Sequence, residues 1–227
     1  MEERFGAVIV AAGSSTRMGG LRSKVLEPLC GEPVLAHTLK IFEECPLIGE
    51  IVVVCRAEDS AEISALLEGC PKPVKLAEGG AQRQDSVLNG VAMLENSDYL
   101  VIHDGARPLV TTEIVERVCR DAVKYGAASA AVKVKDTCKL ADAEGFVLET
   151  PPREALMAVQ TPQVFARSLY LAAADRAGRE GKSYTDDCQL IESAGGRVYL
   201  TPSSYMNLKI TTPDDLITAE ALLQSGE

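Results

Sequence analysis

The chain has 227 residues, of which 46% are hydrophobic and 25% charged, the composition of a globular protein that can bury one substantial core. Its formal net charge of −10 and the absence of a Lys/Arg cluster argue against a nucleic-acid partner. No apolar run approaches the roughly 20 residues that span a bilayer, and the acidic start MEER is not that of a signal peptide, so we expect a cytoplasmic protein with no membrane partner.

The first 134 residues alternate between apolar runs and stretches with helical spacing. Segment 5–12, FGAVIVAA, is almost entirely apolar and is followed by glycine, as in a strand covered on both faces of a parallel sheet. Similar runs predict strands at 51–55, 74–77, 99–103 and 127–134, and helical spacing predicts helices at 34–42, 61–67, 83–94 and 112–125, the last capped by Thr112. This order predicts an α/β fold with a doubly wound, mostly parallel sheet.

The alternation stops after residue 134. Segment 135–156 contains the turn signal DAEG at 142–145 between two short stretches that could pair, and we interpret it as a β-arm projecting from the core. Beyond the arm, helices are expected near 167–178, 187–194 and 213–223, with a strand at 197–201. No long linker or internal repeat interrupts the sequence, so residues 1–227 are expected to form a single domain.

Polar residues that could bind a ligand follow the first predicted strand directly, and ligands of doubly wound sheets bind beyond the carboxyl ends of the strands. Gly13 lets backbone N–H groups approach an anion, Ser14 offers further donors, and Arg17 and Lys24 add positive charge. Neither a Walker A motif nor G-x-G-x-x-G is present. Taken alone, this group could equally be an ordinary strand-to-helix turn with solvated cations.

Two further polar groups follow later strands. Gly79 and Gly80 precede a predicted helix, which suggests close backbone contact with a ligand that Ser86 would face; a capped glycine turn is the alternative. In segment 103–108, HDGARP, the acid suits magnesium or a hydroxyl group and the arginine can hold a phosphate; a salt-bridged turn is the alternative. We expect His103 to pack or to form a hydrogen bond near the sheet edge rather than to titrate in catalysis.

Taken in order, these groups resemble the 2-C-methyl-D-erythritol 4-phosphate cytidylyltransferase family, and the resemblance covers nearly the whole chain. It rests on A-A-G-x-x-x-R-M at 11–18, Lys24, G-G-x-x-R-x-x-S-V at 79–87, H-D-x-A-R-P at 103–108, V-K-D-T at 134–137, Arg153, T-P-Q at 161–163, T-D-D at 185–187 and N-x-K-x-T-x-P-D-D-L at 207–216. Each element would be unremarkable alone. Asp186 and Asp187, for instance, could simply open a helix, where their charge opposes the dipole. The ordered set is specific.

The resemblance implies a Rossmann-like nucleotidyltransferase fold with a β-arm that builds a homodimer. It also implies that CMP is transferred from CTP to 2-C-methyl-D-erythritol 4-phosphate, with release of pyrophosphate and with Mg²⁺ as cofactor, in non-mevalonate isoprenoid biosynthesis. The attacking phosphate is already an anion, so no general base is required, and catalysis depends on positioning and on charge stabilisation. The sequence agrees, because it offers cations and amides but no obvious Ser-His-Asp or Cys-His arrangement.

The resemblance also assigns roles to individual residues. The catalytic residues would be four cations. Arg17 and Lys24 would act at the triphosphate, and Arg153 and Lys209 would act at the acceptor phosphate. The nucleotide would contact Ala11, Ala12, Gly13, Ser14, Gly80, Arg83 and Ser86. The ribose, the metal or the acceptor would contact Asp104, Gly105, Arg107, Thr137 and Thr161, with Asp104 as the candidate metal ligand. Because Arg153 and Thr137 lie on or beside the arm, they would enter the site of the partner subunit.

This chain departs from the family pattern at two positions. Ser15 stands where glycine is common, which puts in question the close approach of the backbone to the ligand there. Ala81 replaces an acid found in some members, which puts in question a contact with the base or the ribose. A ribitol 5-phosphate cytidylyltransferase is one alternative, although the HDGARP and VKDT segments favour the methylerythritol enzyme. A sugar-1-phosphate nucleotidylyltransferase shares the opening motif, usually in a longer chain. A non-catalytic nucleotide-binding regulator would predict a degenerate site, whereas all four assigned cations are present.

Overall fold

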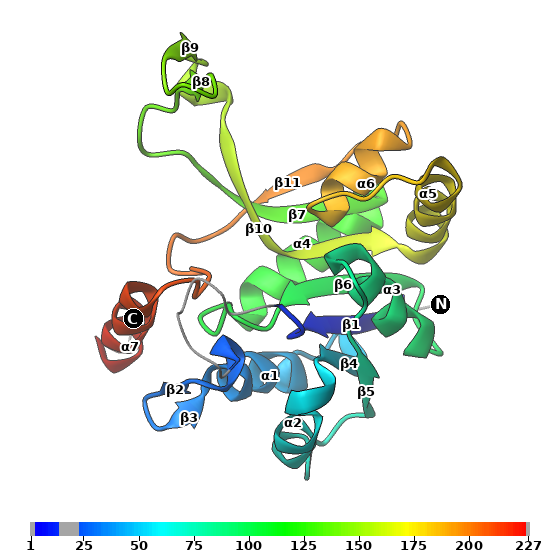
Figure 1. Cartoon of the computed structure of the whole chain (residues 1–227). Coiled ribbons are helices and arrows are strands. Elements are labelled where there is room, and N and C mark those ends of the chain that lie inside the picture. Colours follow the sequence, from blue (N-terminus) through cyan, green and yellow to red (C-terminus); the bar gives the residue numbers. More distant parts are fainter. Residues whose placement is uncertain (1–2, 14–22, 226–227) are drawn as a thin grey trace.

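A seven-stranded sheet runs through the centre of the computed structural model, which describes residues 3–13 and 23–225 (Figure 1). The strand order is β11–β7–β10–β6–β1–β4–β5. The strands are β1 (Phe5–Val10), β4 (Ile48–Cys55), β5 (Val74–Glu78), β6 (Tyr99–Asp104), β7 (Ala127–Lys133), β10 (Met157–Ala166) and β11 (Tyr199–Pro202). All of them run in one direction except β10, which is antiparallel to both β6 and β7. The expected mostly parallel sheet is confirmed.

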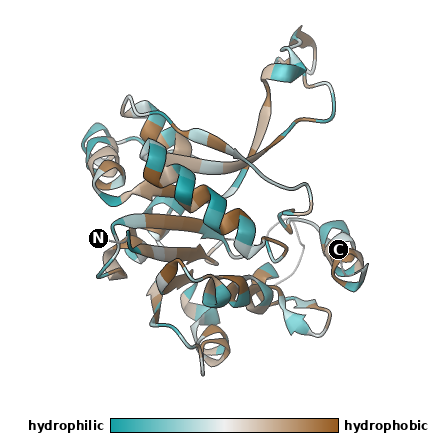
Figure 2. Ribbon diagram, turned by 180° about the vertical axis from the view of Figure 1, so that it is seen from behind, coloured by the Kyte–Doolittle hydropathy of each residue, from teal (hydrophilic) through white to brown (hydrophobic). Residues whose placement is uncertain are grey.

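Helices cover both faces of the sheet, which explains why β1 and most of β4, β6 and β7 are apolar. One face carries α1 (Val34–Glu44), α2 (Ser60–Leu66) and α4 (Thr112–Tyr125), and the other carries α3 (Arg83–Met93), α5 (Arg167–Glu180) and α6 (Asp187–Ser193). In β1, Ala7 and Ile9 pack toward the first set and Val8 toward the second. Figure 2 shows apolar central strands beneath helices with hydrophilic outer faces. The doubly wound arrangement is therefore built by burial on both sides.

Smaller elements complete the chain. α7 (Pro213–Ser225) packs through Ala219 into a separate cluster with Leu29, Val34 and Ile210. The short strands β2 (Pro28–Leu29) and β3 (Glu32–Pro33) pair with each other, and single turns of 3-10 helix form η2 (Lys24–Leu26), η3 (Ala57–Asp59) and η4 (Arg153–Ala155). No helix in the described part of the chain is long and apolar enough to cross a membrane.

Two details of the sequence prediction were wrong. Strand β10 was not predicted, because Gln160, Pro162 and Gln163 interrupt its apolar run, and proline is normally confined to edge strands. The ladder of β10 with β7 is irregular at this point, between Val159 and Gln163. The cap of α4 is Thr111 rather than its neighbour, since the Thr111 hydroxyl accepts a hydrogen bond from the amide of Ile114 at 3.3 Å.

The expected β-arm leaves the sheet after β7 and returns to it at β10. Its strands β8 (Leu140–Ala141) and β9 (Val147–Glu149) form a hairpin that projects from the body of the protein (Figure 1). The predicted turn closes on Asp142, whose carboxylate accepts hydrogen bonds from the amides of Glu144 and Phe146 at 3.0 and 2.9 Å. Four large apolar side chains of the arm are 53–69% exposed: Leu140, Phe146, Val147 and Leu148.

Candidate active site

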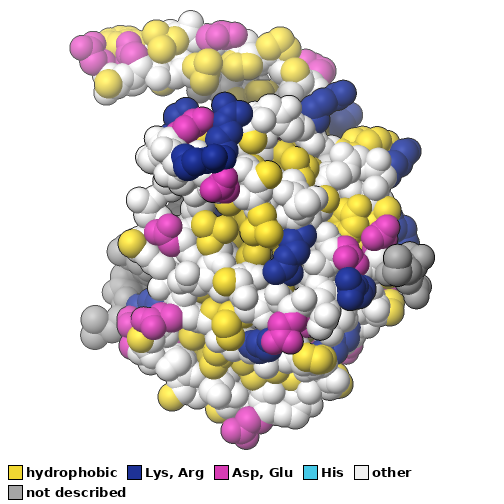
Figure 3. All heavy atoms as spheres, turned by 90° about the vertical axis from the view of Figure 1, so that its right-hand side faces the viewer, with side chains coloured by type: hydrophobic (Ala, Val, Ile, Leu, Met, Phe, Trp, Pro, Cys, Tyr) yellow, Lys and Arg dark blue, Asp and Glu magenta, His cyan; other side chains and the backbone are white. Residues whose placement is uncertain are grey.

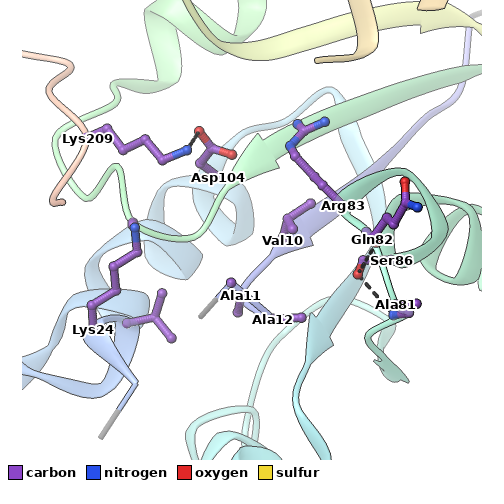
Figure 4. A pocket seen from close by; sticks show the side chains of 14 residues that line it. Val10, Ala11, Ala12, Lys24, Ala81, Gln82, Arg83, Ser86, Asp104 and Lys209 are labelled. Atoms are coloured by element: carbon purple, nitrogen blue, oxygen red, sulfur yellow. Dashed lines mark hydrogen bonds and ion pairs between the residues drawn. The ribbon is translucent and has the colours of Figure 1, made fainter. Parts of the chain in front are cut away.

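A pocket of about 370 Å³ opens at the carboxyl ends of β1, β5 and β6, the edge at which a doubly wound sheet binds its ligands (Figure 4). It is lined by Val10, Ala11, Ala12, Gly13, Lys24, Val25, Gly80, Ala81, Gln82, Arg83, Ser86, Asp104, Ala106 and Lys209. The structure therefore brings together three of the predicted polar groups, which lie far apart in the sequence. The charged residues of this described lining are three cations and one carboxylate, so an anionic ligand is favoured despite the negative total charge.

The first side of the pocket follows β1. Ala11 continues the parallel ladder, since its amide donates to the carbonyl of Val54 at 2.7 Å. Among the described residues, no atom beyond the chain neighbours of Gly13 lies within 4 Å of where a Cβ on this glycine would be. Lys24 begins η2, and its side chain extends toward the same space (Figure 4). Ser14 and Arg17, which were predicted to act here, lie outside the described residues, as does Ser15.

The second side of the pocket is the glycine turn after β5. The two glycines are required by contacts within the protein: a Cβ on Gly79 would lie 2.6 Å from the Cβ of Ala12, and one on Gly80 would lie 2.3 Å from that of Asp85. The Ser86 hydroxyl accepts a hydrogen bond from the Gly80 amide at 3.0 Å and donates to the carbonyl of Gln82 at 3.1 Å. This serine lines the pocket, and it also fixes the shape of the loop.

The third side is a buried ionic cluster around Asp104. Lys209 Nζ lies 2.8 Å from Asp104 Oδ2, and Arg107 Nε lies 3.5 Å from the same oxygen. Burial by itself would raise the pKa of Asp104, but Lys209, Arg107 and Arg83 outweigh it and hold this pKa well below the ordinary range. The carboxylate is therefore ionised. It holds the ammonium group of Lys209 at the pocket wall, where that group can meet a phosphate.

Arg83 lines the pocket but is held from behind by a carboxylate. Its Nη1 lies 2.6 Å from Oδ2 of Asp187, whose side chain is 2% exposed, and the other oxygen of Asp187 accepts a hydrogen bond from the hydroxyl of Tyr170 at 2.7 Å. Asp187 is the first residue of α6, and Asp186 caps this helix through the amide of Gln189 at 2.7 Å. The prediction that Asp186 and Asp187 open a helix is confirmed. Asp187 also forms an ion pair with Arg83, which lies 104 residues away in the sequence.

Several predicted contact residues lie behind the pocket wall. The Thr161 hydroxyl accepts a hydrogen bond from the Asp104 amide at 3.0 Å, so it holds the end of β6. Gly105 packs tightly, because a Cβ there would lie 3.1 Å from Leu35 Cδ1, and Arg107 donates to the carbonyl of Asn207 at 2.8 Å. These three predicted residues support Asp104 and Lys209, and none of them is part of the described lining.

The remaining predicted residues lie at the arm. Arg153 opens η4 and donates from Nη1 to the carbonyl of Lys135 at 3.2 Å, and Thr137 lies exposed in the segment before β8. Neither belongs to the described lining of the pocket in its own chain.

Sequence reasoning missed other residues of the site. Gln82 and Val25 line the pocket, and a glutamine beside a glycine turn was the available signal for the first of them. The buried Gln160 was also missed; it accepts a hydrogen bond from the Asn207 amide at 3.0 Å and so contacts the segment that carries Lys209. Gln160 interrupts the apolar run of β10, and a polar residue in such a run gives no sign in the sequence that it is buried.

His103 is fully buried beside the site, as expected of a packing residue. Its ring lies 4.9 Å from that of Phe42, and Nε2 lies 3.4 Å from the carbonyl of Arg107. Burial lowers the pKa of His103 to about 3; the charge of Asp104 opposes this shift, and the charge of Arg107 adds to it. The ring is therefore neutral at pH 7 and is no proton carrier there.

This buried ring should make the protein less stable in acid. Between about pH 6.5, where a free histidine titrates, and about pH 3, where His103 titrates, the unfolded chain binds an extra proton, so the free energy of unfolding falls as the pH falls. From His103 alone we expect a loss of about 2–3 kcal/mol between pH 6.5 and 4.5. Chemical denaturation of His103→Phe and of the unmodified chain at both pH values would measure it. Equal losses in the two proteins would contradict this assignment.

A mostly parallel α/β sheet with a cation-lined pocket at the carboxyl ends of its strands defines an α/β protein with a site suited to an anionic ligand. A sequence model of the 2-C-methyl-D-erythritol 4-phosphate cytidylyltransferase family matches residues 5–225. The protein of that name from Caldanaerobacter subterraneus subsp. tengcongensis is 46% identical over 222 residues, which are 96% of this chain and 98% of the relative. The chain therefore belongs to the 2-C-methyl-D-erythritol 4-phosphate cytidylyltransferase family, a family of nucleotidyltransferases.

Other relatives and solved structures agree. The protein of the same name from Dehalococcoides mccartyi is 42% identical over 228 residues, 100% of this chain and 99% of its own. The crystal structure of 4-diphosphocytidyl-2C-methyl-D-erythritol synthase from Anaerococcus prevotii superposes with a TM-score of 0.88 at 32% identity, covering 99% of this chain and 100% of that one. For the cytidylyltransferase of Thermus thermophilus the TM-score is 0.78, also at 32% identity, with 98% and 99% covered. The family resemblance drawn from the ordered motifs is confirmed.

Proposed function

We propose that the chain transfers CMP from CTP to 2-C-methyl-D-erythritol 4-phosphate, giving the CDP-linked alcohol and pyrophosphate. The observation that carries this proposal is the pocket at the end of β1, where Lys24 and Lys209 face the glycine turn of β5 in a chain of this family (Figure 4). Backbone groups of Ala11, Ala12, Gly13 and Gly80 would hold the nucleotide, and Ser86 fixes the turn that carries Gly80. The cations would bind its phosphates.

The reaction is a displacement at phosphorus, and the pocket supplies what such a reaction needs. An oxygen of the acceptor phosphate attacks the α-phosphorus of CTP, a new P–O bond forms, and the bond to pyrophosphate breaks. The attacking oxygen carries its own negative charge, so the requirement is to bring two anions together and to stabilise the crowded transition state. We assign this work to Lys24 at the triphosphate and to Lys209 at the acceptor phosphate, with Arg17 and Arg153 in the same two roles.

Mg²⁺ fits this pocket as an ion held mainly by the nucleotide. Magnesium is commonly bound through one or two carboxylates together with substrate phosphates, and Asp104 is an ionised carboxylate in the described lining. Lys209 and Arg107 already neutralise much of its charge. The described residues contain no cluster of three metal-binding side chains. We therefore propose that Asp104 would supply a single protein contact to Mg²⁺, and that a metal bound mainly to the triphosphate would offset part of its negative charge.

The arm is proposed to build a homodimer. Its exposed leucines, valine and phenylalanine have no apolar cover within the described chain, and Figure 3 shows the arm overhanging the body with hydrophobic side chains along it. A second copy of the chain would cover them. Arg153 and Thr137, which do not belong to the described pocket lining of their own chain, would then reach the site of the partner subunit. We further propose that residues 1–227 act as one domain and that the enzyme works in the cytoplasm.

The proposed reaction is tested by pyrophosphate release from purified protein. With methylerythritol phosphate as acceptor, we expect kcat/KM for CTP to exceed that for UTP, ATP and GTP by at least about 100-fold, because a site that pairs with the polar edge of one base leaves groups unpaired with another. Ribitol 5-phosphate is the competing acceptor. Turnover with ribitol phosphate alone would replace the proposed substrate, and no turnover with either acceptor would reject the proposed reaction.

A further inference from the structure

One irregular segment, residues 203–209, carries Lys209 into the pocket and is tied to the sheet on the way. Gln160 of β10 donates to the carbonyl of Ser204 at 3.1 Å and accepts from the side chain of Asn207 at 3.0 Å. The same Asn207 amide group donates to the carbonyl of Thr161 at 2.9 Å, and Asn207 is fully buried. The segment is therefore anchored on β10, close to the strand end that holds Asp104.

The same segment also touches the root of the arm through Tyr205. The Tyr205 hydroxyl donates to the carbonyl of Lys133 at 2.8 Å, and the Lys135 ammonium lies 3.7 Å from the centre of the Tyr205 ring. Lys133 is the last residue of β7 and pairs with Met157, the first residue of β10, so this rung marks where the arm leaves the sheet. A hydrogen bond and a cation–π contact thus join the segment to Lys133, where β7 ends, and to Lys135, where the arm begins.

Arg153 is part of the same set of contacts. Its guanidinium donates to the carbonyl of Lys135 at 3.2 Å, so the residue whose side chain rests on Tyr205 also holds Arg153. Beyond the sheet, the outgoing and returning segments of the arm root are joined by one long hydrogen bond. In it, the Val134 amide donates to the Leu156 carbonyl at 3.4 Å. A rotation of the arm about this root would displace Arg153. Tyr205 opposes such a rotation from the side.

We propose that Tyr205 is a positioning residue that fixes the direction of the arm at its root. Segment 203–209 would then fix the positions of two cations that bind acceptor phosphates. One is Lys209, in the pocket of its own chain, and the other is Arg153, which the arm carries to the neighbouring pocket. This inference rests on the proposed function for the roles of these two cations. It gives Tyr205 an effect on the acceptor that is separate from any effect on CTP, because the Tyr205 side chain contacts the arm root, whereas Gly80 and Ser86 on the nucleotide side are hydrogen-bonded to each other and to Gln82.

Substitution of an exposed tyrosine tests this role without disturbing the core, since Tyr205 is 49% exposed. Tyr205→Leu removes both contacts, and we expect KM for methylerythritol phosphate to rise about 5- to 20-fold while KM for CTP stays within about twofold. Tyr205→Phe keeps the ring beneath Lys135 and should raise the acceptor KM only about 2- to 5-fold. The matched control is Tyr125→Leu, at a tyrosine that is 44% exposed and stacks on Tyr199 at the sheet edge; it should change neither constant.

A second measurement reads the arm directly and does not depend on turnover. Cys138 lies exposed in the arm and can carry a nitroxide label, with Cys30→Ser and Cys70→Ser as background. We expect the label to be more mobile in Tyr205→Leu than in the unmodified chain, and intermediate in Tyr205→Phe. Equal mobility in the three proteins, or a parallel rise of both KM values, would overturn the inference. If the unmodified chain shows no turnover, the proposed function is rejected, and the mobility of the label still tests whether Tyr205 fixes the arm.

Discussion

Replacing Lys24 with alanine should lower kcat by roughly 10²–10³-fold, an effect comparable to removing one donor that stabilises an oxyanion. Lys24 lines the pocket beside the end of β1, and the reaction brings an anionic acceptor against an anionic triphosphate. The charge of Lys24 offsets the repulsion that grows in the transition state. Because that charge acts in a partly enclosed pocket rather than in bulk water, its removal costs far more than the loss of a surface charge.

The measurement is kcat from pyrophosphate release at saturating CTP and acceptor, with a thermal melt to confirm that the variant folds. Its fold should be intact, because η2 buries Val25 and Leu26 rather than Lys24. Lys40→Ala, at an exposed position of α1, removes the same charge away from the pocket and serves as the control. A Lys24→Ala variant with turnover within about threefold of the unmodified chain would remove Lys24 from the catalytic group.

Most of the sheet could be predicted because burial on both faces leaves a simple pattern. Strands such as β1 and β4 contribute side chains to two cores, so nearly every residue is apolar. Strand β10 lies just as centrally but carries polar residues. Gln160 and Gln163 are buried and hydrogen-bonded to other parts of the chain. A pattern based on hydrophobicity cannot detect a strand whose polar side chains are satisfied by distant partners.

The site could be predicted to the extent that it follows from strand ends. Gly13 and Gly80 follow the ends of β1 and β5 by three and two residues, and Asp104 is the last residue of β6; parallel strands place these positions on one edge. The partners of the charged side chains could not be predicted. Arg83 pairs with Asp187, 104 residues away, and Arg107 contacts the carbonyl of Asn207, 100 residues away. Such pairs depend on how helices and loops pack over the sheet, which local sequence does not record.

Mixing two inactive variants should restore activity if the arm completes the neighbouring site. Arg153 begins η4 near the arm root and does not belong to the described pocket of its own chain. In a dimer of Lys24→Ala with Arg153→Ala, one site lacks both cations and the other has both. Random pairing makes half of the dimers mixed, so about one quarter of the unmodified activity should return. We expect each variant alone to retain about 1% or less, by the same charge argument as for Lys24.

A second mixture separates this arrangement from a site built within one chain. When the unmodified chain is mixed in equal amounts with the double variant Lys24→Ala/Arg153→Ala, a shared site leaves activity only in unmodified homodimers, which is about one quarter of the starting value per total chain. A site within one chain would leave about one half, because each unmodified subunit would work beside any partner. Subunit exchange is verified by co-purification of differently tagged chains. Half-activity in this mixture, together with no recovery in the first, would place Arg153 outside the neighbouring site.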